Sequence, residues 1–307
     1  MSQLSSGLVM EGGAMRGMFT AGVTDVFMEQ NIHFDGAVGV SAGATFGCNL
    51  KSHQIGRAIR YNKKYCRDWR YGSFKSVLKT GDIYDADFCY RLLPDELDKF
   101  DTDTFASNPL VFYMVATDVE TGEPVYYKCT DGGRKDLLWM RASASMPIVS
   151  KPVPIDGKKY LDGGISDSIP VHFMEQQKYD RIAVILTQPA EYRKKASALQ
   201  PLMNLMLHRY PAIAYDMKTR AKRYNDTLDY ICAEEKKGNL FVIRPDEALN
   251  IGKTENDPAE LERVYQLGRT KAKRILPELR SFISGACTDS GAREPCARSF
   301  RATLSEF

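Results

Sequence analysis

The chain has 307 residues, 43% of them hydrophobic and 26% charged, which is typical of a soluble globular protein able to bury a large core. No apolar run approaches the roughly 18 residues that a membrane span needs, and the N-terminus lacks the features of a secretory signal. The net charge of +3 and seven scattered cysteines without a Cys-x-x-Cys pair argue against a nucleic-acid partner and a zinc ribbon, and favour a reduced, cytoplasmic compartment.

The first unit of the chain is predicted to be a strand, a glycine-rich turn and a helix. Residues 7–10 are apolar, and residues 11–17 follow with the sequence Glu-Gly-Gly-Ala-Met-Arg-Gly. Spacings of i, i+4, i+7 and i+8 predict an amphipathic helix ending near residue 30, with a buried face made by Phe19, Val23, Val26 and Phe27. Such a turn directs several backbone N–H groups and a helix dipole at one point, which predicts an anion site.

Two anions fit this turn. Gly12-x-Ala14-x-x-Gly17 is close to the G-x-G-x-x-G pattern that binds a dinucleotide pyrophosphate. That pattern needs an acid at the end of the second strand, whereas Asp35 stands at its beginning. The other anion is the oxyanion of a tetrahedral intermediate formed at Ser41. We favour the oxyanion, because parallel strands present their carboxyl ends at one edge of a sheet and the two loops can converge there.

The second unit places Ser41 on a sharp bend. Residues 34–40 are apolar and β-prone, residues 39–43 form the G-x-S-x-G pentapeptide, and residues 44–52 have helical character. A strand, a tight turn and a helix expose the serine hydroxyl, and Gly39 and Gly43 remove the Cβ clashes that the bend would create. This arrangement is typical of an activated nucleophile.

Charge is unevenly distributed over the next segment. Residues 49–71 have helical character, with an aromatic stripe made by Tyr61, Tyr65 and Trp69. Residues 57–79 contain eight Lys or Arg and one acid, whereas residues 80–108 contain eight acids and two bases. The simplest interpretation is that the two segments lie close together and compensate each other. The alternative is a basic face directed at anionic lipid.

The remaining elements alternate between strands and helices. Strands are predicted at residues 110–116, 124–128, 180–186 and 239–243, and helices at 82–105 (short, broken by Pro94), 137–145, 190–237 and 258–284 (broken or kinked at Pro277). The loop Asp162-Gly163-Gly164 follows a turn at residues 155–157 and an extended segment. We therefore expect Asp162 where a loop can approach Ser41.

Four motifs resemble those of patatin-like phospholipases, in the same order and at similar spacing: residues 11–17, 39–43, 142–147 (Ala-Ser-Ala-Ser-Met-Pro) and 162–164. The resemblance covers roughly residues 7–186 and continues more weakly to about residue 284. It implies an α/β protein with a three-layer α/β/α fold and a mostly parallel central sheet. It also implies a Ser–Asp dyad without histidine and hydrolysis of lipid acyl esters of the phospholipase A or lysophospholipase type, without cofactor or metal.

Carried over by position, the resemblance makes Ser41 the nucleophile and Asp162 the proton acceptor. The oxyanion loop would then be formed by Gly12, Gly13, Ala14, Arg16 and Gly17, and the motif glycines would be Gly39, Gly43, Gly163 and Gly164. The family usually has a third glycine where this chain has Ala14, which puts the identity of the N–H donors in question.

The resemblance also suggests a division of the chain. Residues 1–186 would be the catalytic core, residues 187–284 would complete the same domain and provide a lid, and residues 285–307 would form a loose tail. The expected partner is lipid or phospholipid, with peripheral contact to the inner membrane face. A lid is suggested by an apolar cluster within residues 190–237: Leu199, Leu202, Met203, Leu205, Met206 and Leu207. The alternative is that this cluster packs on the sheet as part of the core.

Three alternatives stay open at this point. A histidine could serve as the base, with His172 the best placed, although a triad fold puts its nucleophile after more strands than precede Ser41. The same acyl-enzyme could transfer its acyl group to an alcohol in place of water. A non-catalytic nucleotide-binding module could use the first glycine loop.

Overall fold

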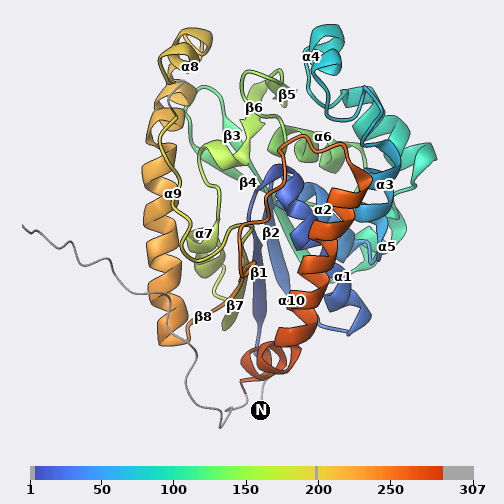
Figure 1. The fold of residues 1–307 in the computed structure, drawn as a ribbon, viewed down its shortest axis with the longest axis vertical. Helices are drawn as coiled ribbons and strands as arrows, with labels where there is room; N and C mark the ends of the chain where they lie inside the picture. The colour runs from blue at the N-terminus through green and yellow to red at the C-terminus, as the bar shows by residue number, and fades with distance from the viewer. Residues whose placement is uncertain (1–3, 198–199, 286–307) are drawn as a thin grey trace, which may run out of the picture.

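A mixed β-sheet runs through the middle of the molecule (Figure 1). The computed structural model describes residues 4–197 and 200–285. The strands are β1 (Ser6–Met10), β2 (Gly36–Val40), β3 (Val111–Asp118), β4 (Pro124–Lys128), β5 (Val153–Ile155), β6 (Lys158–Asp162), β7 (Arg181–Ile185) and β8 (Leu240–Ile243). Their order is β5-β6-β3-β2-β1-β7-β8, and β4 also pairs with β3. Neighbours from β3 to β8 in this order are parallel, so the sheet is mostly parallel as predicted.

Helices cover both faces of the sheet (Figure 1). One face carries α1 (Gly17–Glu29), α2 (Ala42–Lys51), α3 (Arg57–Tyr65), α6 (Arg134–Ser143) and α10 (Pro258–Ser284), and the other carries α7 (Val171–Gln176) and α9 (Pro211–Lys237). Leu8 and Met10 of β1 pack into the first layer and Val9 into the second, because alternate side chains of a strand point to opposite faces. The predicted three-layer α/β/α fold is confirmed.

Smaller elements lie outside these layers. They are the short helices α4 (Phe74–Thr80), α5 (Thr102–Ser107) and α8 (Gln200–Met206), a π-helix η2 (Phe88–Leu97), and the 3₁₀ turns η1 (Ala14–Arg16) and η3 (Gly163–Ile165). Among the helices described, none combines the length and the apolar character needed to cross a membrane.

Four predicted helices differ from the structure. The break expected at Pro94 is absent, because this proline lies inside η2. The helix expected over residues 49–71 is divided into α2 and α3, because the chain turns at Gly56, which adopts a left-handed φ of 72°. In the described part of residues 190–237, helix is confined to α8 and α9, and residues 190–197 are irregular. In α10 the helix continues through Pro277, so the expected break is absent. The tail predicted for residues 285–307 lies outside the described residues from 286 onward.

The strand β3 pairs with two different strands along one of its sides. β2 and β4 both pair with residues 113–115 and therefore lie on opposite sides of β3. β4 and β6 both pair with Ala116 and Thr117, so they also lie on opposite sides. It follows that β6 occupies the side of β3 that β2 leaves after Val40.

The C-terminal helix α10 is packed directly against the first helix, α1. A Cβ added to Gly268 would lie 2.1 Å from the carbonyl oxygen of Phe19, and one added to Gly22 would lie 2.1 Å from that of Tyr265. The Tyr265 hydroxyl donates a buried hydrogen bond of 2.6 Å to the Asp25 carboxylate. Two glycines thus allow the helix backbones to touch, and the C-terminal region is part of the same core.

This contact predicts a loss of stability for Gly268→Ala. The added methyl group meets backbone, which cannot move aside cheaply, so the free energy of unfolding should fall by about 1–3 kcal/mol. Gly252→Ala is the matched control, because its Cβ would meet nothing closer than 3.6 Å, and it should change stability by less than about 0.5 kcal/mol. Urea unfolding of both variants measures the difference, and equal midpoints would contradict the close packing.

Candidate active site

Ser41 sits on a strained turn between β2 and α2. Its φ of 53° and ψ of −119° are unusual for a residue with a side chain, and the residue forms the N-cap of α2. Its backbone N–H donates a hydrogen bond of 3.0 Å to the hydroxyl of Ser143, at the end of α6. Gly43 allows the turn, because a Cβ there would lie 2.4 Å from the carbonyl oxygen of Met10. The predicted serine elbow is therefore present in the backbone.

Asp162 ends the hairpin formed by β5 and β6. The hairpin turns at Asp156 and Gly157, which both have positive φ, as a tight two-residue turn requires. The N–H of Asp162 donates to the carbonyl oxygen of Ser145 at 2.8 Å, and its Oδ1 accepts from the N–H of Gly164 at 2.7 Å. The 142–147 motif therefore supports both loops, Ser41 through Ser143 and Asp162 through Ser145.

The register along β3 brings Ser41 and Asp162 together. Val40 is paired with Val115, and Asp162 is paired with the next residue of β3, Ala116. Burial raises the pKa of the Asp162 carboxyl, and a side-chain hydrogen bond from Ser41, the charge of Arg220 and the Gly164 N–H oppose that rise.

The first glycine loop lies against Ser41. A Cβ on Gly12 would be 3.0 Å from the carbonyl oxygen of Val40 and 3.2 Å from Cβ of Ser41, so this glycine permits the close approach of the two loops. Its N–H already donates to the carbonyl oxygen of Ser168, at 3.4 Å. Among the described residues, the N–H groups of Gly13 and Ala14 have no acceptor. Of the predicted loop, these two are the best-placed donors for an anion.

The other two predicted loop residues have different surroundings. The Arg16 Nε donates to the hydroxyl of Thr187 at 3.3 Å. The N–H of Gly17 is directed at the carbonyl oxygens of the 3₁₀ turn η1, and a Cβ on this residue would lie 2.7 Å from that of Ala42. Gly17 therefore serves the packing of α1 on α2, and its N–H is not free to bind an anion.

Ala14 adopts the left-handed conformation, with a φ of 49°. The loop therefore has a backbone conformation that glycine would adopt without strain, and the methyl group of Ala14 does not prevent this conformation. A residue with a side chain in this region typically costs on the order of 1–3 kcal/mol, so the surrounding structure must hold the loop in place.

Helix α9 holds the loop that carries Asp162. The guanidinium of Arg220 donates to the carbonyl oxygen of Gly164, and that of Arg223 donates to the carbonyl oxygen of Ile165 at 2.8 Å. Both arginines lie far from the four motifs in the sequence, and nothing in the sequence singled them out. Ser143, in contrast, belongs to the 142–147 motif and could have been noticed there.

Helix α9 also reaches the first glycine loop. The buried Glu11 accepts a hydrogen bond of 2.6 Å from the Tyr224 hydroxyl and one from the N–H of Thr187, at the end of β7. Glu11 thereby ties its loop to two elements that the sequence does not place near it.

A cavity adjoins Ser41, Ala42 and Ala14. The cavity contains about 800 Å³ of empty space, part of which is open to solvent. Its walls are largely apolar and include Phe46, Leu93, Phe100, Leu137, Met140 and Met146.

Polar groups in the cavity wall are mostly neutral. Burial raises the pKa values of four tyrosine phenols above their ordinary range, those of Tyr61, Tyr71, Tyr84 and Tyr90. Arg57 is the one Lys or Arg in the wall within the described part of the chain. Its guanidinium is 3.4 Å from the carboxylate of Asp98 and donates to the carbonyl oxygen of the same residue at 2.7 Å. The cavity therefore suits an uncharged, largely apolar ligand.

The alternative site residues lie elsewhere. His172 is exposed, with its ring nitrogen 3.1 Å from Glu175 and its ring against Tyr230. Among the residues that the structure describes, no histidine lines the cavity beside Ser41. Asp35 accepts from the N–H of Ser6 at 2.7 Å and precedes β2, so it is at the opposite edge of the sheet from the glycine loop. Within the described residues no group of His, Cys, Asp and Glu could hold a metal ion.

Comparisons with known proteins show which family the chain resembles. The family described as patatin-like phospholipase matches residues 8–174, and a domain of unknown function (DUF6363) matches residues 210–284. The chain is 31% identical over 299 residues to a protein of Escherichia coli strain K12 named Uncharacterized protein YjjU, covering 90% of this chain and 78% of that one.

More distant relatives are longer. The chain is 23% identical over 295 residues to Lysophospholipase nte1 of Aspergillus oryzae, and the match covers 90% of this chain but 18% of the relative. The crystal structure of VipD from Legionella pneumophila covers 90% of this chain and 67% of its own, with 11% identity and a TM-score of 0.44, a likeness too weak to carry an argument.

The contact of α9 with the loop that carries Asp162 predicts that Arg220→Gln shifts the pH dependence of reaction at Ser41. If Asp162 accepts the Ser41 proton, reaction at Ser41 is lost as the pH falls through the Asp162 pKa. Removing the nearby cation should raise that pKa further, since the charge of Arg220 lowers it. The rate at which a fluorophosphonate labels Ser41 should therefore show its midpoint at higher pH than in the wild type.

Arg220→Lys is the matched control for this experiment, because it retains the charge but not the planar fork. Its midpoint should stay close to that of the wild type even if its labelling is slower. A midpoint unchanged in Arg220→Gln, with the fold intact, would show that Arg220 only supports the loop.

Proposed function

The chain belongs to the patatin-like phospholipase family, and we propose that it is a serine lipid acyl hydrolase of the phospholipase A or lysophospholipase type. Family membership and the lysophospholipase relatives support lipid hydrolysis as the class of reaction. The observation that carries the finer proposal is the pairing along β3 that brings Asp162 next to Ser41, together with the largely apolar cavity that Ser41 lines. The cavity is the natural place for an acyl chain whose carbonyl carbon lies at Ser41.

In the first half of the proposed reaction, the Ser41 oxygen attacks the carbonyl carbon of the acyl ester. Asp162 accepts the serine proton, because a hydroxyl is a weak nucleophile until a base removes its proton. The carbonyl oxygen becomes an oxyanion, which the N–H groups of Gly13, Ala14 and Ala42 would stabilise. Loss of one such donor typically costs about 3–4 kcal/mol of transition-state stabilisation. The intermediate then expels the alcohol, which takes the proton from Asp162, and leaves an acyl-Ser41 ester.

In the second half, water attacks the acyl-enzyme. Asp162 accepts a proton from the water, the oxyanion forms again at the same N–H groups, and the proton passes to the Ser41 oxygen as the fatty acid leaves. Burial of Asp162 favours this role, because a raised pKa makes the carboxylate a stronger base than an exposed aspartate. An alcohol in place of water would give acyl transfer from the same intermediate.

The substrate is best identified with purified protein. The panel should contain glycerophospholipids, lysophospholipids and neutral esters, with the released fatty acid and any transacylated product measured in the same reaction. Release of fatty acid supports the hydrolase, whereas a product ester that depends on added alcohol would identify a transferase.

The variant Ser41→Ala should lose ester hydrolysis while keeping its fold. Loss of an activated serine typically costs about a million-fold in turnover, and alanine removes only the hydroxyl oxygen from the elbow. The measurement is fatty-acid release on the best substrate, together with a melting curve. Activity above about one part in a thousand of the wild type, with a normal melting temperature, would remove Ser41 from the role of nucleophile.

Asp162→Asn should lower turnover nearly as much as Ser41→Ala does. His172→Ala should lower turnover by less than about threefold, because His172 contacts Glu175 and Tyr230 but not the cavity. The neutral amide should also leave the protein at least as stable at pH 7, because the raised pKa means that burying the Asp162 charge opposes folding above that pKa. Turnover and urea unfolding test the two parts, and a large loss in His172→Ala would favour a triad.

A further inference from the structure

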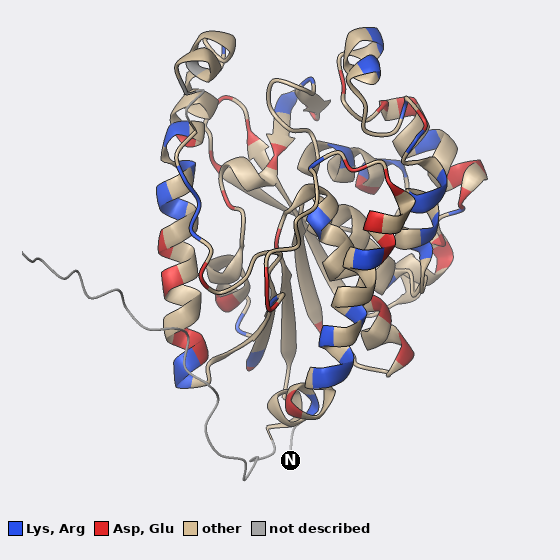
Figure 2. Ribbon diagram, in the orientation of Figure 1, with Lys and Arg blue, Asp and Glu red and all other residues tan. Residues whose placement is uncertain are grey.

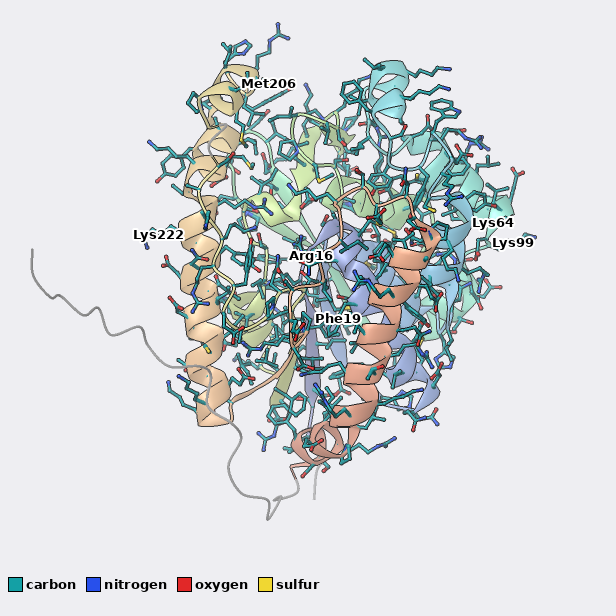
Figure 3. All side chains as sticks on the ribbon, in the orientation of Figure 1. Arg16, Phe19, Lys64, Lys99, Met206 and Lys222 are labelled. Atoms are coloured by element: carbon teal, nitrogen blue, oxygen red, sulfur yellow. The ribbon has the colours of Figure 1, made fainter. Side chains whose placement is uncertain are left out.

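Helices α4 and α8 project from the same end of the molecule (Figure 1). Both stand at the end toward which β1 and β2 run, beyond the carboxyl edge of the sheet where Ser41 lies, and they flank that edge from opposite sides. Figure 3 shows Met206 at the outer tip of α8. Two segments more than a hundred residues apart in the sequence thus form one rim around the approach to the site.

Exposed apolar side chains gather on this rim. Of the nine large hydrophobic side chains that are exposed in the described part of the chain, α4, α8 and the loop after α6 carry six: Phe74, Leu78, Ile148, Leu202, Leu205 and Met206. Phe74 and Leu78 are 72% and 75% exposed. Single apolar residues scattered over a surface are normal, whereas a cluster of exposed apolar residues marks an interaction site. Concentration at one end indicates a surface that is covered by something apolar.

The rim is continuous with the cavity. Tyr71 and Tyr84 pair with each other at the base of the α4 projection, and both line the cavity beside Ser41. The loop that carries Ile148 begins at Met146, another cavity residue. It contacts the segment that follows α4, through a hydrogen bond from the N–H of Ile83 to the carbonyl oxygen of Val149. An apolar chain could therefore pass from the rim to Ser41 along apolar surface.

The apolar cluster around α8 is divided in two. Leu207 is buried with Ile165 and Ile213, and this contact fixes the end of α8 to the body of the protein. The side chains of Leu202, Leu205 and Met206 point away from it and are at least half exposed. Leu199 lies outside the described residues.

The charge of the rim is positive. Residues 71–80 and 200–210 contain Lys75, Lys79 and Arg209 and no Asp or Glu, and α4 is blue without red in Figure 2. Many other cations of the basic segment are neutralised, as Arg60 is by Asp98 at 2.7 Å. Lys75 and Lys79 instead lie over the Trp69 ring, with no carboxylate partner in the described residues. These charges complement an anionic surface.

We propose that α4 and α8 together form the docking surface by which this protein binds an anionic lipid aggregate. Phe74 and Leu78 on one side, and Leu202, Leu205 and Met206 on the other, would enter the acyl region of the lipid surface, while Lys75 and Lys79 meet its phosphate groups. The proposal rests on the proposed function, since it describes how a lipid would reach Ser41.

Binding to vesicles in the Ser41→Ala background tests docking separately from catalysis. The full chain is mixed with vesicles of phosphatidylglycerol and phosphatidylcholine, and the bound fraction is measured by flotation. Phe74→Ser with Leu78→Ser, and separately Leu202→Ser with Leu205→Ser, should each weaken binding by about tenfold or more, because several buried methylene groups are lost. Lys75→Gln with Lys79→Gln should weaken it by about fivefold for each lysine, and only when phosphatidylglycerol is present.

Ile55→Ser with Leu267→Ser is the matched control, because these side chains are 40% and 43% exposed but lie outside the rim. The control should bind vesicles like the parent protein. With Ser41 restored, the rim variants should hydrolyse a short soluble ester at the wild-type rate and lose activity on vesicles. Hydrolysis of the soluble ester also tests the proposed function independently of docking.

Three results would overturn the proposal. The first is that the rim variants bind vesicles as well as the parent protein does. The second is that the control variant loses as much vesicle binding as the rim variants do. The third is a parent protein that fails to float with vesicles but elutes as a dimer, which the rim variants convert to a monomer. That last result would assign the rim to a second copy of the chain. Melting temperatures equal to that of the parent confirm that a loss of binding is not a loss of fold.

Discussion

The site depends on a single strand, β3, pairing with two partners along one side. β2 pairs with it as far as Val115 and then leaves the sheet at Ser41, and β6 enters antiparallel with Asp162 opposite Ala116. Backbone hydrogen bonds fix this register, and a slip of one residue in either strand would turn its side chains to the other face. The end of α6 secures both loops, through the Ser143 hydroxyl and the Ser145 carbonyl. The distance between the side chains of Ser41 and Asp162 is therefore set by the paired strands and by the end of α6.

The region after residue 187 has a direct part in holding this arrangement. α9 contributes Arg220 and Arg223 to the Asp162 loop and Tyr224 to Glu11. α10 packs against α1 through Gly268 and Gly22, where the backbones touch. The matched family region ends at residue 174, yet the first glycine loop and the Asp162 loop both need partners beyond it. We infer that the two parts of the chain fold as one unit around the site.

Several features at the site oppose folding and are held by their surroundings. Ser41 and Ala14 have left-handed φ values that their side chains disfavour, and the Asp162 carboxyl is buried with a raised pKa. Together such features typically cost a few kcal/mol, a large share of the stability of an ordinary domain. They are tolerated because the extensive core on both faces of the sheet supplies the stability and because the same strain keeps Ser41 exposed to the cavity.

The sequence by itself determined the elements whose signals are local. Apolar runs and glycine positions predicted the strands around β1, β2, β3, β7 and β8, the elbow at Ser41 and the loop at Asp162, and four motifs in order were enough to predict the family. Tertiary structure decided what depends on contacts between distant segments. The carbonyl oxygen of Ser168 accepts the N–H of Gly12, which leaves other N–H groups of the glycine loop free. The loop that carries Asp162 is supported by Arg220, which donates to the carbonyl oxygen of Gly164. The joining of α4 and α8 into one rim follows from the position of both helices beyond the carboxyl edge of the sheet (Figure 1). No local pattern encodes these contacts, because each is a meeting of residues whose separation in the sequence carries no information about their distance in space.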